Sequence, residues 1–229
     1  HIVKSGNNVA FAKSDGEFGE VLHNGLRFNR YTDHFLSDFG SIYYDEIAGT
    51  IVYNKTNSIF QSKQGNIKLI NEFTRPIKNF LRVGSEYIVA SSQGTYVYSL
   101  PQEGFVQKYK ITDDWSRVLI RIPGSTEVYV SGNHGLYFLN KIQRKWKITR
   151  HLFHNEQISS ISSDGRYIYA LSFKGEVYQV DRSGKQRVFY KLPESIRAVQ
   201  LVVHRDKLFL ATNNGLLVIN TKNLRRTII

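Results

Sequence analysis

The chain has 229 residues, of which 41% are hydrophobic and 13% aromatic, so it is long enough to bury a sizeable core. It has no Cys, which excludes disulfides, thiolate metal sites and a thiol nucleophile, and it has no apolar run long enough for a membrane-spanning helix. Lys and Arg outnumber Asp and Glu by 31 to 19, and this formal net charge of +12 raises the question of an anionic partner.

A short apolar run, a polar turn and a second apolar run recur along the whole chain. The residues that close these turns are Gly16, Ser58, Gly94, Gly135, Gly175 and Gly215. Their successive spacings are 42, 36, 41, 40 and 40 residues. A period that persists through six units is typical of a repeat architecture. Because no Pro-, Ser- or Gly-rich linker interrupts the repeats, we expect one domain over residues 1–229.

Each repeat is expected to form four strands joined by tight turns, such as the one at His23-Asn24-Gly25, where Asn-Gly supplies positive φ angles. The strands expected in the first three repeats are 1–5, 8–13, 17–22 and 26–31; 41–46, 50–55, 58–63 and 66–73; and 78–83, 87–92, 95–100 and 106–111. Those expected in the last three are 117–122, 127–132, 136–141 and 144–149; 157–162, 167–172, 176–181 and 186–191; and 196–204, 207–212, 216–221 and 224–229.

The second and third strands of each repeat are nearly continuous in apolar and aromatic residues, as expected for a sheet that is covered on both faces. The sequence therefore predicts an all-β fold, a β-propeller of six four-stranded blades, with ring closure by the last blade against the first. A fragment of a seven- or eight-bladed ring is the alternative. The expected blades are 1–38, 39–76, 77–115, 116–156, 157–195 and 196–229.

Short motifs in the later repeats add a family resemblance. They are Ile158, Ser160, Ile161, Asp164 and Gly165 in one strand, and the turns at 132–136 and 211–216. These residues resemble the repeats of two-component regulator propellers, although Tyr or Phe stands where the family usually has Trp in the second strand. The resemblance implies the extracytoplasmic sensor region of a bacterial hybrid histidine kinase or one-component regulator. It also implies detection of a signal or ligand, a membrane-anchored parent protein and, usually, a homodimer.

The basic residues gather at the fourth strand of the repeats, where we expect the exposed outer edge of each blade. They are Lys108, Lys110, Arg144, Lys145, Lys147, Lys185, Arg187, Arg225 and Arg226. Charged residues on edge strands block edge-to-edge aggregation. A nucleic-acid surface would need these charges to converge on one face, and blade edges point in different directions. We therefore interpret them as edge protection and do not expect a nucleic-acid partner.

Ligands are expected at the loops that lead from one blade to the next, predicted at 32–38, 74–78, 112–116, 151–157 and 193–195. The candidate ligand-binding residues are Arg75, Trp115, Arg117, Arg121, His154 and Arg197. Trp115 follows two Asp residues, so its ring could stack on a sugar or aromatic ligand or could cover the end of a blade. Arg side chains near the first strands could bind a carboxylate, sulfate or phosphate group, or could be neutralised by acidic residues. His134 is interpreted as a turn residue.

No pattern points to catalysis, because G-x-S-x-G is absent and only Asp45 and Glu46 lie near an expected channel strand. We expect no enzyme activity, no metal and no cofactor. The predicted function is a non-catalytic, ligand- or protein-binding sensor module at a periplasmic or extracellular location, with a cytoplasmic location as the alternative. A WD-repeat-like interaction scaffold and a basic NHL-like RNA-binding propeller are the alternatives. The chain has no Met and begins at His1, so we expect a processed product or a piece of a longer protein.

Overall fold

The computed structural model describes residues 2–5, 8–12, 17–22, 25–30, 39–45, 50–63, 66–99, 106–122, 124–204 and 206–228. These residues form β-strands and turns and contain no helix, hence none that is long and apolar enough to cross a membrane. The chain folds into two compact units, residues 1–112 and 113–229.

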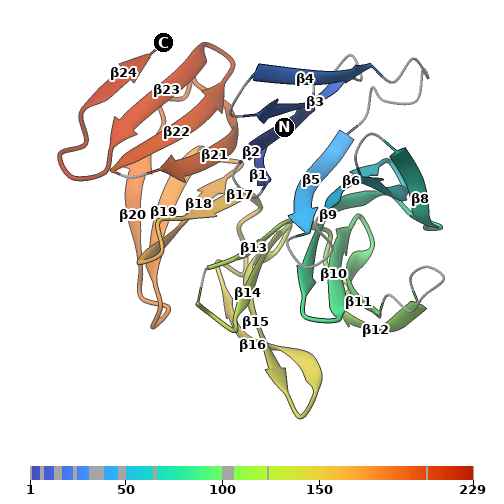
Figure 1. Ribbon diagram of the computed structural model, residues 1–229. Helices are drawn as coiled ribbons and strands as arrows, with labels where there is room; N and C mark the ends of the chain where they lie inside the picture. Colours follow the sequence, from blue (N-terminus) through green and yellow to red (C-terminus); the bar gives the residue numbers. More distant parts are fainter. Residues whose placement is uncertain are drawn as a thin grey trace. The chain divides into compact units, whose positions relative to one another are not determined.

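The first unit contains three four-stranded antiparallel sheets whose strands lie in sequence order (Figure 1). Sheet 1 consists of β1 (Ile2–Ser5), β2 (Asn8–Ala12), β3 (Glu17–Leu22) and β4 (Gly25–Arg30). Sheet 2 consists of β5 (Phe39–Asp45), β6 (Thr50–Lys55), β7 (Ser58–Lys63) and β8 (Asn66–Glu72). Sheet 3 consists of β9 (Ile77–Val83), β10 (Glu86–Ser91), β11 (Gly94–Ser99) and β12 (Val106–Thr112).

The second unit repeats this plan in three further sheets. Sheet 4 consists of β13 (Ser116–Arg121), β14 (Val128–Gly132), β15 (Gly135–Ile142) and β16 (Lys145–Leu152). Sheet 5 consists of β17 (Ile158–Ser163), β18 (Tyr167–Ser172), β19 (Glu176–Asp181) and β20 (Gln186–Lys191). Sheet 6 consists of β21 (Ala198–His204), β22 (Lys207–Thr212), β23 (Gly215–Asn220) and β24 (Arg226–Ile228).

The predicted all-β class is confirmed for the described residues, and each sheet lies inside the residue limits expected for one repeat. That the sheets close into one six-bladed ring, as one domain, stays a prediction. Three predicted loops are shorter than expected, because Ile77 and Lys78 belong to β9, Thr112 to β12, Ser116 to β13, and His151 and Leu152 to β16. The predicted loop 32–38 lies outside the described residues.

The glycines that close the turns are required where the second strand meets the third. Gly94 and Gly135 have φ angles of 128° and 130°, which other residues rarely adopt. A Cβ atom at Gly94 would lie 2.1 Å from the carbonyl oxygen of Thr112, and one at Gly135 would lie 2.1 Å from that of Leu152. The turn therefore packs against the end of the fourth strand, and only Gly leaves room for this contact.

Sheet 5 shows why its middle strands are apolar without alternation. Ile168 and Val180 belong to a core cluster shared with sheet 4, whereas Leu171 and Val177 belong to one shared with sheet 6. Successive side chains point to opposite faces of a strand, so each face of sheet 5 packs against a neighbour. The first strands also meet, since β17 contacts both β13 and β21. In the first unit an equivalent core cluster joins sheets 2 and 3.

The fourth strand of each sheet, called its outer strand here, is much less buried. In β20 only Phe189 is buried, and in β16 only Trp146. All nine basic residues that the sequence places at outer strands are exposed. Lys108 pairs with the buried Glu86, with 3.1 Å between Nζ and Oε1. The interpretation of these charges as residues of exposed edges agrees with their positions.

Candidate functional site

The loops at one end of sheets 4 and 5 bring together several of the predicted site residues. Trp115 immediately precedes β13, and its carbonyl oxygen accepts a hydrogen bond of 3.0 Å from the backbone N–H of Asn133, in the turn between β14 and β15. This bond connects the residue before the first strand of sheet 4 to the turn between its second and third strands. The Trp115 side chain is 37% exposed, so much of its ring remains accessible.

Arg117 contacts two aromatic rings in these loops. Its Cζ lies 4.5 Å from the ring centre of Trp115 and 4.8 Å from that of Phe173, in the turn of sheet 5. Its Nη2 donates a 3.1 Å hydrogen bond to Oδ1 of Asn133, and its buried Nε has no partner among the described residues. Burial lowers the pKa of Arg117, and the negative charge of Asp114 opposes this shift. The guanidinium is thus held by cation–π contacts beside exposed rings.

Asp114 organises the neighbouring turn from a nearly buried position. Its Oδ2 accepts hydrogen bonds of 3.0 Å from the backbone N–H of His134 and from the hydroxyl of Tyr137. Its Oδ1 lies 2.7 Å from Nδ1 of His134. A Cβ atom at Gly132 would lie 2.2 Å from Oδ2 of Asp114, so this glycine makes room for the carboxylate. His134 therefore lies in the predicted turn, and its backbone and side chain both contact the Asp114 carboxylate.

Two further imidazoles extend this group. The ring of His151 stacks on Tyr137 at 4.2 Å, and His154 meets His151 edge-on at 4.0 Å. His151 Nε2 lies 2.7 Å from the carbonyl oxygen of His134, to which it donates when it carries the proton. Burial lowers the pKa of His151, while the bond to His134 raises it and the neighbouring His154 lowers it. The net effect lowers the pKa of His151, which favours the neutral imidazole.

These contacts define one group of side chains, called the loop cluster here: Asp114, Trp115, Arg117, His134, Tyr137, His151, His154 and Phe173. Three predicted candidates, Trp115, Arg117 and His154, belong to it. Their role in ligand binding stays a prediction. The arrangement offers exposed aromatic rings, a fixed guanidinium and an ordered carboxylate, which are groups suited to recognition.

The other predicted residues lie elsewhere. Arg121 is exposed at the far end of β13, about 13 Å along the strand from Arg117. Arg197 precedes β21 at the position that Trp115 has before β13, and its backbone exchanges hydrogen bonds with Asn213. Arg75 lies in the first unit, where its guanidinium hydrogen-bonds the hydroxyl of Tyr96 and contacts that ring. The described contacts therefore do not join these arginines into one site.

Phe173, Asn133 and Tyr137 were not among the candidates. Phe is a residue type that usually lies in the core, yet Phe173 is 56% exposed at the turn. One sequence feature could have identified Phe173. It stands two residues before the Gly that closes the turn, where two other repeats have Asn133 and Asn213. No cluster of potential metal ligands is found in the described part of the chain.

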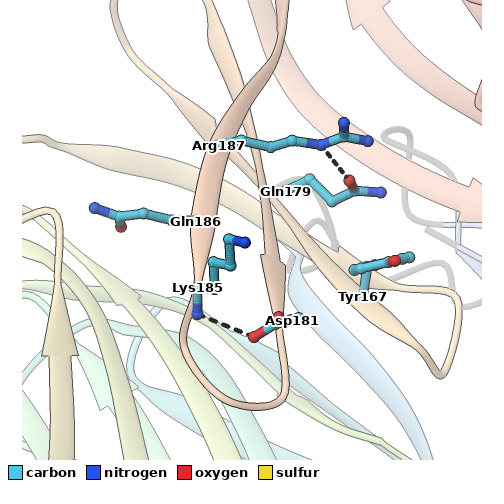
Figure 2. A pocket seen from close by; sticks show the side chains of 6 residues that line it. All are labelled: Tyr167, Gln179, Asp181, Lys185, Gln186 and Arg187. Atoms are coloured by element: carbon cyan, nitrogen blue, oxygen red, sulfur yellow. Dashed lines mark hydrogen bonds between the residues drawn. The ribbon is translucent and has the colours of Figure 1, made fainter.

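A second feature lies at the opposite end of sheet 5, where a polar hollow of about 280 Å³ opens (Figure 2). Its lining comes from β18, β19, β20 and the turn before β20: Tyr167, Gln179, Asp181, Lys185, Gln186 and Arg187. Figure 2 shows Arg187 joined to Gln179 by a hydrogen bond, and the backbone of Lys185 joined to Asp181.

No protein-family model matches the chain, and no curated protein matches it. Among solved structures, it is similar to the extracellular domain of a protein of B. thetaiotaomicron assigned as a one-component system, with a TM-score of 0.73 and 15% identity. The match covers 96% of this chain but only 33% of that domain, so the chain spans about a third of its length.

Other solved structures are similar to a comparable degree. A virginiamycin B lyase of Staphylococcus aureus matches with a TM-score of 0.75 and 10% identity, over 99% of this chain and 82% of the lyase. The WD40 domain of Neurospora crassa Pan2 matches with a TM-score of 0.68 and 13% identity, over 97% and 76%. The expected similarity to sensor regions of bacterial regulators is thus confirmed at the level of the fold. The chain has an all-β fold similar to that of a solved β-propeller domain and to that of the extracellular domain of a bacterial regulator.

Proposed function

We propose that this chain is a non-catalytic sensor module that binds a small ligand or a protein partner at the loop cluster. The observation that carries the proposal is the contact of Arg117 with the exposed rings of Trp115 and Phe173. Trp and Arg dominate the energetically important positions of binding surfaces, and Phe is enriched there. Exposing two large rings to water has no benefit for folding, so a binding partner that covers them explains their placement.

The fold supports the sensing part of the proposal. The similar B. thetaiotaomicron domain is extracellular and belongs to a one-component or hybrid two-component system. This likeness supports our proposal that the chain lies outside the cytoplasm, as part of a bacterial signalling or transcription-regulating protein whose parent is anchored in a membrane. We also propose a homodimer, which the resemblance to two-component regulator propellers implies. The similar lyase shows that the fold also hosts catalysis, so the non-catalytic part of the proposal rests on the likeness to the extracellular domain of the regulator.

We also propose that the six sheets close into a six-bladed ring, with sheet 6 against sheet 1. Sheet 6 has one buried apolar face, with Leu208, Leu210, Leu217 and Ile219, whereas Val202 and Leu216 on its other face are 46% and 37% exposed. Ring closure would cover this second face. Replacement of Val202 by Asp would then destabilise the protein by about 2 kcal/mol or more, because a charge would be buried. An unchanged urea midpoint would contradict closure.

The binding proposal is tested by thermal denaturation of the wild type and of the double variant Trp115→Ala/Phe173→Ala. A panel of sugars and small organic anions serves as the probe. We expect at least one compound to raise the Tm of the wild type and to leave the double variant unchanged. Val188→Ala, an exposed apolar residue on β20, is the control and should respond like the wild type. An equal shift in the double variant would exclude the loop cluster as the site.

Two measurements separate the rival functions. Sedimentation velocity over a range of concentrations tests the homodimer, and a dimer that dissociates in the double variant would make a second copy the partner. Fluorescence anisotropy with single-stranded RNA at low salt tests the RNA-binding alternative, because phosphate contacts are strongest there. Tight RNA binding would overturn the sensor proposal.

A further inference from the structure

Sheets 4 and 5 contain the same row of three paired residues across their second, third and fourth strands. The row in sheet 4 is Tyr129, Phe138 and Arg150. The row in sheet 5 is Tyr169, Gln179 and Arg187. Arg150 and Arg187 therefore occupy equivalent places on the two outer strands. Their surroundings differ, and the difference points to a binding site.

In sheet 4 the protein neutralises the arginine itself. Nη2 of Arg150 donates to Oε1 of Glu127 at 3.1 Å, and Nη1 donates to the carbonyl oxygen of Arg182 at 2.8 Å. The Glu127 carboxylate also accepts from the Tyr129 hydroxyl at 2.7 Å and from Nδ2 of Asn140 at 2.8 Å. Both ends of this ion pair are thus held by protein groups.

In sheet 5 the carboxylate is missing from the equivalent place. Glu127 stands two residues before Tyr129, and the residue two before Tyr169 is Tyr167. Arg187 is nevertheless held in position: its Nε donates to Oε1 of Gln179 at 2.8 Å, and Nε2 of Gln179 donates to the Tyr169 hydroxyl at 3.0 Å. Among the described residues, the terminal Nη atoms of Arg187 have no hydrogen-bond partner.

Asp181 does not take over the role of Glu127. Asp181 follows Gln179 by two residues, as Asn140 follows Phe138 in sheet 4. Its Oδ1 accepts hydrogen bonds from residues of the turn that follows it. It accepts from the Ser183 hydroxyl at 2.6 Å and from the Lys185 backbone N–H at 2.9 Å. The bond from Ser183 is the main cause that lowers the pKa of Asp181, so this carboxylate is ionised at neutral pH.

Arg187, Gln179 and Asp181 line the hollow of Figure 2, together with Tyr167, Lys185 and Gln186. All six belong to sheet 5, and the hollow lies at the end of the sheet opposite to Phe173. Its volume of about 280 Å³ is at the small end of small-molecule sites. We propose that this hollow binds a small molecule through a carboxylate group, which sits at the Nη atoms of Arg187 as Glu127 does at Arg150.

The chemistry of the hollow selects a carboxylate over a phosphate. The two Nη atoms of a guanidinium match the two oxygens of a carboxylate, and Lys185 adds a second positive charge. The ionised Asp181 repels a doubly charged phosphate more strongly than a singly charged carboxylate. A hydroxyl or amino group on the same molecule would find an acceptor in the second oxygen of Asp181. We therefore expect hydroxy acids or amino acids to bind better than acetate.

The test is isothermal titration calorimetry of the whole chain at low ionic strength with acetate, lactate, glycine and inorganic phosphate. We expect lactate or glycine to bind, acetate to bind more weakly and phosphate more weakly still. Arg187→Ala should weaken binding by about tenfold or more, because a charged hydrogen-bond pair is lost. Lys191→Ala is the matched control. It removes a positive charge from the same strand, at a side chain that is 69% exposed and outside the hollow, and should leave the affinity unchanged.

A second variant converts the hollow into the arrangement of sheet 4. Tyr167→Glu supplies a carboxylate at the place of Glu127, and it should abolish binding and raise the Tm, whereas Tyr167→Phe should retain binding. The proposal is overturned if none of the carboxylates binds, if Arg187→Ala binds as tightly as the wild type, or if phosphate binds best. The Trp115→Ala/Phe173→Ala variant should bind normally, so a failure here does not bear on the loop cluster.

Discussion

The inner strands and the outer strand of sheet 5 have the same length and the same backbone pairing, yet they differ sharply in burial. Val180 on β19 is fully buried, whereas Val188 on the adjacent β20 is 54% exposed. The inner strands, β18 and β19, pack against neighbouring sheets on both faces, and the outer strand lies beyond those contacts. The inner strands therefore determine the fold. The outer strands and the strand ends can change their side chains without changing the fold, and both proposed sites lie there.

The largest expected effect on stability is at an inner strand of sheet 5. Val180→Ala should lower the free energy of unfolding by about 2.5 kcal/mol, because apolar area is lost and the packed surroundings leave a cavity. Urea unfolding followed by Trp fluorescence measures it. Both Trp residues, Trp115 and Trp146, lie in the second unit, so the signal reports on these sheets. A loss below about 1 kcal/mol would show that the inner strands are loosely packed.

A somewhat smaller effect is expected at the strand ends. Asp114→Ala removes the acceptor for the Tyr137 hydroxyl and for the His134 backbone N–H, and should cost about 2 kcal/mol. Asp114→Asn keeps one acceptor oxygen and should cost less. If both variants were as stable as the wild type, the Asp114 carboxylate would make no contribution to the stability of the turn.

The link between inner and outer strands of sheet 4 predicts a pH dependence. Burial raises the pKa of Glu127, but hydrogen bonds from Tyr129, Asn140 and Arg150 outweigh it and hold the pKa below the ordinary 4.5. The folded state thus binds this proton less readily than the unfolded state, so its contribution is present above about pH 4.5 and is lost as the pH falls through the lowered pKa.

Glu127→Gln should therefore cost about 1 kcal/mol at pH 7 and should flatten the loss of stability in acid. The measurement is the urea midpoint of both proteins between pH 7 and pH 3. Parallel curves would mean that Glu127 does not join the two strands electrostatically.

The smallest effect is expected on the outer strand itself. Val188→Ala should change the free energy of unfolding by no more than about 0.5 kcal/mol, because the side chain is already largely in water. Measured beside Val180→Ala, it gives the contrast between the two strands directly. A loss of similar size in both variants would mean that another surface covers β20 in solution.

The strands of the fold could be predicted because their signals are local. Each turn combines a polar residue with a Gly that is required by its φ angle and by the nearby fourth strand, as at Gly94 and Gly135. The end of β16 could not be predicted in this way. It extends to Leu152 because Leu152 pairs with Leu136 at the start of β15 and the register shift near Phe138 adds a residue to β16, which depends on the partner strand.

The site was less predictable for the same reason. Trp115 and Arg117 stand out by residue type, but the burial of Asp114 depends on the absence of a side chain at Gly132. The exposure of Phe173 depends on its place in a turn rather than on its hydrophobicity. The contrast between Arg150 and Arg187 needs the pairing of three strands, which only the structure supplies.

Each sheet is built from strands that follow one another directly in the sequence. A sheet is thus complete as soon as its own segment has left the ribosome, without waiting for distant parts of the chain. Local pairing of this kind favours rapid folding, and domains generally fold from the N-terminal side during synthesis. We therefore expect the strands of each sheet to pair soon after their own segment of the nascent chain emerges.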